Sequence, residues 1–178
     1  MIKLGAGKVL ALIGAIIALV SVALSFIAPA FFGWYRIEVS SLGITVGVYI
    51  TGIGSIVTVP AILPVEGMAI FELIGGIVLI IGAIVCIVGA VKESKAAGIV
   101  GGILILVGPL LLILDLLLGL GDFAALIALL GGPTGTSAFW GSITIVGPPD
   151  VVMSWGIWIG AFLALGGGVL GLIGGAAV

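Results

Sequence analysis

The 178-residue chain has no histidine, no asparagine and no glutamine, and its single cysteine is Cys86. Without histidine, haem and most zinc or copper sites lose their usual ligand, so we expect no cofactor and no metal centre. One thiol cannot form an internal disulfide, and Cys86 lies in an apolar run where it reads as a packing residue. The lack of deamidation-prone amides also suits a thermophile protein.

Charge is scarce as well. Charged residues make up 7% of the chain, against about 25% in ordinary soluble domains. Such a chain cannot cover a water-facing surface, so lipid must be its main solvent. The five basic residues form no patch that would hold nucleic acid. The sequence contains no Ser-His-Asp set and no CxxC motif, and we therefore expect that the protein is not an enzyme.

Long hydrophobic runs are what the sequence does contain. Each of four runs reaches the roughly 20 residues that cross about 30 Å of hydrocarbon. Only helices or closed barrels span a membrane, and the runs show no strict alternation. The sequence therefore predicts an α-helical membrane protein, a four-helix transmembrane bundle in one domain. The expected spans cover residues 8–33, 68–91, 97–118 and 151–175.

Basic residues set the expected orientation. Lys3 and Lys8 precede the first span. Lys92 and Lys95 lie in the short turn between the second and third spans, whereas the two longer connections hold one basic residue, Arg36. By the positive-inside rule, the N-terminus and the short turn are cytoplasmic. Four crossings then return the C-terminus to the cytoplasm, as in a multi-pass protein of the cell membrane.

The two longer connections, 34–67 and 119–150, look ordered. They are rich in Val, Ile and Thr, and Gly and Pro mark turns, which is typical of short strands. We predict a small extracellular antiparallel β-sheet, built mainly from the first connection and completed by the second. Residues 122–130 either extend the third helix or form a separate interfacial helix. The expected strands cover 34–39, 43–50, 55–59 and 141–146.

Aromatic side chains gather near the predicted outer boundary of the membrane. Amphipathic rings settle at the level of the lipid headgroups, and almost none of the aromatic residues falls at the inner boundary. The outer side is therefore the more elaborate side of the protein. The expected interfacial anchors are Trp34, Tyr35, Trp140, Trp155 and Trp158.

Two acidic residues lie within the spans, both toward the outer side. Glu72 falls in the first turns of the second span, and Asp115 falls near the end of the third. Their similar depth lets them share a membrane polar site, and charged groups at membrane depth are costly and often functional. The alternative is that each carboxylate lies near enough to the headgroups to be hydrated, and that Glu72 gains from the helix dipole.

Glycine is abundant, with 32 residues. Small residues four positions apart let helix backbones approach closely. Such rows serve either packing inside one bundle or association between subunits, and the fourth span carries two rows on different faces. The residues expected to make these helix-packing or assembly contacts are Gly98, Gly102, Gly156, Gly160, Gly167, Gly168, Gly171 and Gly175.

The plan of four spans, two outer segments with strands and a short inner turn resembles the claudin-like tetraspan proteins. Trp34, just after the first span, lies where that family has an aromatic residue. The family's paired cysteines are absent, because the only cysteine is Cys86. Claudins pair their outer strands between subunits and polymerise, so the resemblance implies lateral assembly.

Three functions fit these features. The first is a structural membrane protein that self-associates laterally into an oligomer or array through Gly-rich helix faces and outer strand edges. The second is an accessory subunit of a larger membrane complex. The third is a small ion or proton channel that uses Glu72 and Asp115. We favour the first, with the lipid bilayer and further copies or other membrane subunits as partners.

Overall fold

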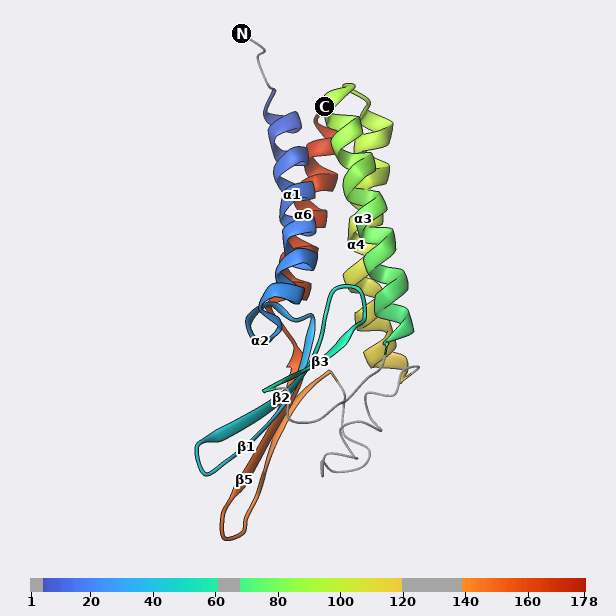
Figure 1. The fold of residues 1–178 in the computed structure, drawn as a ribbon. Helices are drawn as coiled ribbons and strands as arrows, with labels where there is room; N and C mark the ends of the chain where they lie inside the picture. The colour runs from blue at the N-terminus through green and yellow to red at the C-terminus, as the bar shows by residue number, and fades with distance from the viewer. Residues whose placement is uncertain (1–4, 61–67, 120–138) are drawn as a thin grey trace.

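A computed structural model describes residues 5–60, 68–119 and 139–178. In these ranges four long helices stand side by side: α1 (Ala6–Ile27), α3 (Ile70–Val91), α4 (Lys95–Leu118) and α6 (Ile159–Ala176) (Figure 1). Each is long and apolar enough to cross a membrane. The predicted bundle of four long apolar helices is thereby confirmed.

The helix ends follow local sequence rules. A short helix α2 (Pro29–Phe32) follows α1 and begins with a proline, which needs no hydrogen bond at that position. The Ser94 hydroxyl caps α4 by accepting a hydrogen bond from the Ala97 amide. At the other end of α4, Gly119 adopts a left-handed conformation (φ 60°) that closes the helix. The expectation for residues 122–130 lies outside the described residues.

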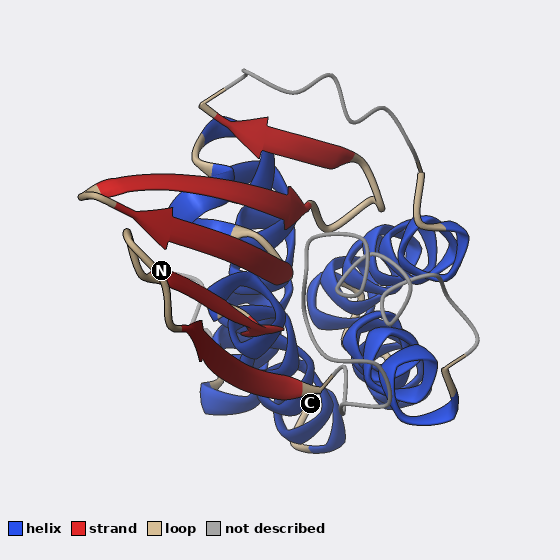
Figure 2. Cartoon of the chain, turned by 90° about the horizontal axis from the view of Figure 1, so that it is seen from below, coloured by secondary structure: helices blue, strands red, loops and turns tan. Residues whose placement is uncertain are grey.

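A five-stranded antiparallel sheet lies at one end of the bundle, here called the sheet end. The strand order is β3-β2-β1-β5-β4. The strands lie below the α1–α6 pair, and the α3–α4 pair stands to one side (Figures 1 and 2). The predicted small antiparallel sheet is confirmed. Its strands are β1 (Tyr35–Ser41), β2 (Ile44–Ile50), β3 (Ile56–Val59), β4 (Trp140–Ile145) and β5 (Val151–Ile157).

The fourth span needs a correction at its start. We expected a helix from residue 151 to 175, but residues 151–157 form β5 and the helix begins at Ile159. β5 lies between β1 and β4. Its alternate side chains Met153 and Trp155 are buried, as the two-residue period of a strand requires. Hydropathy alone does not separate such a buried apolar strand from the start of a helix.

The sheet joins the bundle through continuous backbone bonding. The Trp34 amide donates to the Ile50 carbonyl at 2.7 Å, and the Trp158 amide donates to the Trp34 carbonyl at 2.9 Å. The Gly160 amide donates to the Gly33 carbonyl at 3.0 Å. Strands β1 and β5 therefore run directly into α2 and α6, which fixes the sheet relative to these helices.

The opposite end, here called the turn end, holds the α3–α4 connection. The N-terminal part of α1 and the C-terminus lie there too (Figure 1). The Lys8 ammonium contacts the Glu93 carboxylate at 2.5 Å and links α1 to the turn. This ion pair lowers the pKa of the exposed Glu93 carboxyl group.

Candidate functional site

The glycine row in α4 faces α6. A methyl group at Gly98 would lie 2.6 Å from the Gly175 Cα, and one at Gly102 would lie 2.5 Å from the Leu172 Cα. A methyl group at Gly168 would in turn lie 2.6 Å from the Leu106 side chain. These residues are therefore used where α4 and α6 cross within one chain.

The second glycine row of α6 faces α1 and the middle of the bundle. A methyl group at Gly167 would lie 2.7 Å from the Gly14 carbonyl oxygen. One at Gly171 would lie 3.4 Å from the Cys86 sulfur, which is itself fully buried. The α6 glycines thus pack inside the bundle, Gly167 against α1 and Gly175 of the same row against α4.

Two of the expected glycine contacts lie at the sheet end. Gly156 belongs to β5, not to a helix, and it has a φ of 154° beside the Trp140 ring. Gly160 is the second residue of α6 and packs against the Gly33 carbonyl and the Trp34 ring. Neither residue takes part in a helix-to-helix row, because the helix begins later than the sequence suggested.

The aromatic residues divide into a buried set and an exposed one. Trp34 and Tyr35 are fully buried and Trp155 is nearly so, and they form part of the core where the sheet meets the bundle. Burial raises the pKa of the Tyr35 hydroxyl. Trp140 is 59% exposed on β4. Of the five expected anchors, Trp140 presents the largest free surface, while Trp158 is half-buried and donates its ring N–H to the Ala30 carbonyl at 3.0 Å.

A charged cluster lies on the part of the sheet nearest the helices. The Arg36 guanidinium contacts the Glu38 carboxylate at 2.9 Å and stacks 3.4 Å from the centre of the Trp158 ring. The Tyr49 hydroxyl donates to the same carboxylate at 2.7 Å. Burial and this carboxylate raise the pKa of Tyr49. All four groups are engaged with one another, which makes the cluster a structural clamp between β1, β2 and α6.

The two acids inside the helices are both buried. Glu72 is 0% exposed and Asp115 is 2% exposed. Close contacts of Gly82 with Ile105 and of Gly89 with Gly98 set the antiparallel register of α3 and α4, and the same register places Glu72 opposite Asp115. The two carboxyl groups are close enough to interact directly. The alternative, in which each carboxylate is exposed and hydrated, does not fit this degree of burial.

A turn between β2 and β3 reaches up into the helix bundle (Figure 1). The Gly52 amide donates to the Ser25 hydroxyl of α1 at 2.8 Å, and the Ala69 amide donates to the Gly54 carbonyl at 2.8 Å. The Gly52 carbonyl oxygen packs against Gly76, one helical turn along α3 from Glu72. The turn therefore brings buried backbone oxygen close to the level of the carboxyl pair.

Sequence reasoning did not single out Ser21, Ser25 and Thr51, which are all fully buried. The two serines face the carbonyl groups of their own helix, with the Ser25 hydroxyl 2.6 Å from the Val22 carbonyl oxygen. Their spacing of four residues in an otherwise apolar helix was a pattern that places both on one face. Nothing in the sequence indicated that Thr51 would enter the bundle.

Strand β4 forms one edge of the sheet. Among the described residues it pairs only with β5. It has no charged residue and no proline, and its exposed side chains include Trp140 and Ile145. The opposite edge, β3, has only four residues and is followed directly by Pro60. β4 is thus the longer and less protected edge.

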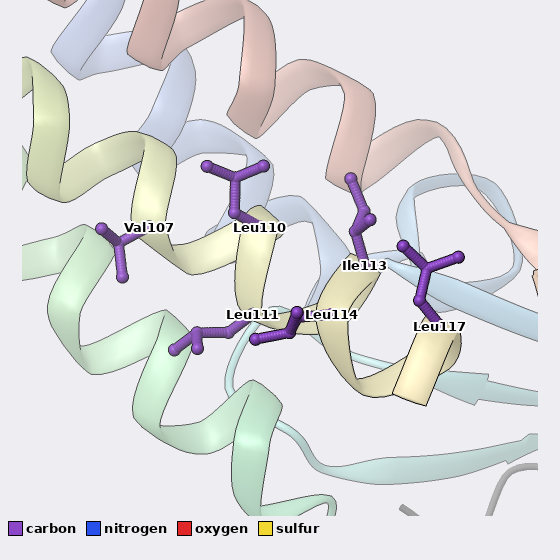
Figure 3. A pocket seen from close by; sticks show the side chains of 6 residues that line it. All are labelled: Val107, Leu110, Leu111, Ile113, Leu114 and Leu117. Carbon is purple, nitrogen blue, oxygen red and sulfur yellow. The ribbon is translucent and has the colours of Figure 1, made fainter. Parts of the chain in front are cut away.

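A shallow hollow lies on the surface of α4. Its six lining side chains are all apolar and all come from α4 (Figure 3). Because the hollow offers no polar group, it has the chemistry of a lipid-facing surface and supplies no means of selecting a polar ligand. The lining residues are Val107, Leu110, Leu111, Ile113, Leu114 and Leu117.

Comparison with known proteins gives no relative from which a function could be inferred. No protein-family model, no curated protein and no solved structure matches the chain.

Proposed function

We propose that this protein is a structural membrane protein that assembles laterally with copies of itself through the edge strand β4. The observation that supports this most strongly is the edge itself: six residues, Trp140–Ile145, without a charge or a proline. Proteins normally protect sheet edges with charges, prolines, bulges or very short strands. An edge without these devices offers main-chain donors and acceptors to another strand.

The exposed apolar side chains of β4 add to this surface. Trp140 is 59% exposed and Ile145 is 42% exposed, and Val146 at the adjoining hairpin tip is 85% exposed. Exposed aromatic and aliphatic groups beside a strand edge that no other described strand pairs with are typical of interaction surfaces. Pairing of two such edges about a two-fold axis joins identical surfaces and makes a continuous ten-stranded sheet, given five strands in each copy.

The glycine rows contribute differently from our first expectation. The sequence predicts lateral association through Gly-rich helix faces as well as through strand edges. The close contacts of Gly98, Gly102, Gly167 and Gly168 are made within the bundle. We therefore assign assembly to the sheet and assign these glycines to the internal packing that holds the sheet in place.

The orientation belongs to the same proposal. The positive-inside rule places the turn end, with Lys8, Lys92 and Lys95, in the cytoplasm. The sheet then lies outside the cell, where neighbouring copies meet edge to edge. The resemblance to claudin-like proteins rests on two outer segments that both contribute strands to one sheet. That feature suits a role in lateral assembly.

The proposal is tested by placing a charge on the edge. Thr144 is exposed on β4, and its cross-strand partner is the exposed Val152 of β5. We expect Thr144→Lys to reduce oligomers to single copies, because an unpaired charge at a strand edge blocks pairing. Val152→Lys is the matched control, since it adds the same charge to an interior strand of the sheet.

The measurement is the mass of particles extracted from native membranes in mild detergent, by size exclusion with light scattering. Single copies in the unmodified protein, or equal effects of Thr144→Lys and Val152→Lys, would contradict assembly through β4. Stoichiometric copurification with different, larger subunits would instead make the chain an accessory subunit.

A further inference from the structure

We infer that Glu72 and Asp115 form a binding site for one small monovalent cation, H⁺ or Na⁺, at the sheet end of the bundle. This inference is independent of assembly through β4. It starts from two carboxyl groups, contributed by α3 and α4, that interact directly and are 0% and 2% exposed. Two ionised carboxylates side by side without water repel each other strongly. One bound cation between them removes that repulsion.

The unpaired oxygens of the Glu72 side chain are a second observation that favours a bound ligand. Neither of its carboxylate oxygens has a hydrogen-bond partner among the described residues, although the side chain is fully buried. A buried polar group without a partner keeps its full desolvation penalty, and this penalty is larger for a charged carboxylate than for a neutral group. A shared proton or a coordinated cation satisfies these oxygens, and a protonated carboxyl group also supplies a donor.

Within residues 5–60, 68–119 and 139–178, no basic side chain is placed to do this instead. Helix α6 has no charged residue, and the only charged residue of α1 is at the turn end. The Thr51–Ser55 turn that packs on α3 has none either. Arg36 is engaged with Glu38 on the sheet. The remaining basic residues belong to the N-terminal segment and the turn end: Lys3, Lys8, Lys92 and Lys95.

The surrounding atoms favour a hard, small cation. The groups at this level are oxygens: two carboxyl groups, the Gly52 carbonyl beside Gly76, the Thr51 hydroxyl on the same turn, and the Ser25 hydroxyl of α1, which accepts from the Gly52 amide. Nitrogen and sulfur ligands of transition metals are absent from this group of residues. Calcium takes six to eight oxygens in a roomy site. One proton needs only the two carboxyl groups. A sodium ion also draws on the carbonyl and hydroxyl oxygens of the neighbouring turn and helix.

The experiment uses the full chain in lipid nanodiscs and follows thermal unfolding by tryptophan fluorescence. NaCl is compared with choline chloride at equal ionic strength, and each series is repeated between pH 5 and pH 9. A ligand that binds only the folded protein raises the midpoint as its concentration rises above the dissociation constant. We expect a sodium-dependent rise at neutral to alkaline pH if Na⁺ is the occupant. If H⁺ is the occupant, we expect a rise on acidification in choline chloride and no response to sodium.

Glu72→Gln is the decisive variant, because it keeps the shape and removes the charge. Either response should be lost in Glu72→Gln and kept in Glu93→Gln, which changes an exposed carboxyl group at the turn end. The inference is overturned if the unmodified protein responds to neither ion, or if Glu72→Gln responds as the unmodified protein does. Should Glu72→Gln fail to fold, Asp115→Asn replaces it, and proton release on sodium addition is measured on the unmodified protein with a pH dye.

Discussion

The close crossing of α1 and α6 allows one prediction to be worked out in detail. A methyl group at Gly14 would lie 2.5 Å from the Gly167 carbonyl oxygen and 2.9 Å from the Gly171 Cα. Because these are backbone atoms, no side-chain rotation can relieve the clash. Reaching an ordinary contact of about 3.5 Å requires the helices to separate by about 1 Å, and such a gap forfeits a quarter to a half of the dispersion energy of the atoms involved.

We therefore expect Gly14→Ala to destabilise the protein by about 1–3 kcal/mol, the usual cost of overpacking. Gly166 is the matched control: it lies in the same helix pair, on α6, but a methyl group there meets nothing within 4 Å. Gly166→Ala should stabilise α6 by roughly 0.5–1 kcal/mol, because alanine restricts the unfolded chain and favours the helix.

The assay is thermal unfolding of both variants in the same mild detergent, followed by tryptophan fluorescence. For a chain of this size, the expected loss in Gly14→Ala corresponds to a fall in the midpoint of roughly 2–12 °C. The Gly166→Ala midpoint should stay level or rise. Equal midpoints for Gly14→Ala and the unmodified protein would refute the internal packing role of this row. A changed particle mass with an unchanged midpoint would show that the row works between copies instead.

Two further predictions concern the sheet end. Ser25→Ala should cost about 1–3 kcal/mol in the same unfolding assay, because it leaves the buried Gly52 amide without its acceptor; a cost equal to zero would mean that the turn is not held by this bond. Tyr49→Phe should cost about 1–2 kcal/mol at neutral pH through the lost bond to Glu38. Because the pKa of Tyr49 is raised in the folded protein, the stability that its protonated hydroxyl contributes is present below about pH 10 and is lost as the pH rises further. Tyr49→Phe should therefore also flatten the fall in the free energy of unfolding at alkaline pH. An unchanged pH profile would contradict this.

The sequence predicted the helices well, because runs as long and apolar as 70–91 and 95–118 have few other structures available to them. It also predicted β1 and β2, where β-branched residues are followed by turn glycines. It missed β5, since a strand between two neighbours is as apolar as a spanning helix. Only pairing with β1 and β4 separates the two, and pairing is a property of the whole fold.

The candidate site was predictable in part. The similar depth of Glu72 and Asp115 followed from their distances to the helix ends. Their direct juxtaposition did not, because it depends on the register of α3 and α4, which close glycine contacts determine. The burial of Trp34 and the entry of Thr51 into the bundle were likewise beyond the sequence. Both depend on how the sheet docks onto the helices.

Assembly through β4 is the central claim, and cysteine cross-linking in native membranes tests it most directly. Cys86 is fully buried and will not react, so an introduced thiol is the one available for cross-linking. Ser142→Cys places it on the exposed side of β4, and Ser154→Cys, at the cross-strand partner on β5, is the matched control. Mild oxidation should give a disulfide-linked dimer from Ser142→Cys and little from Ser154→Cys. No dimer from Ser142→Cys, or equal dimer from both variants, would contradict pairing along β4.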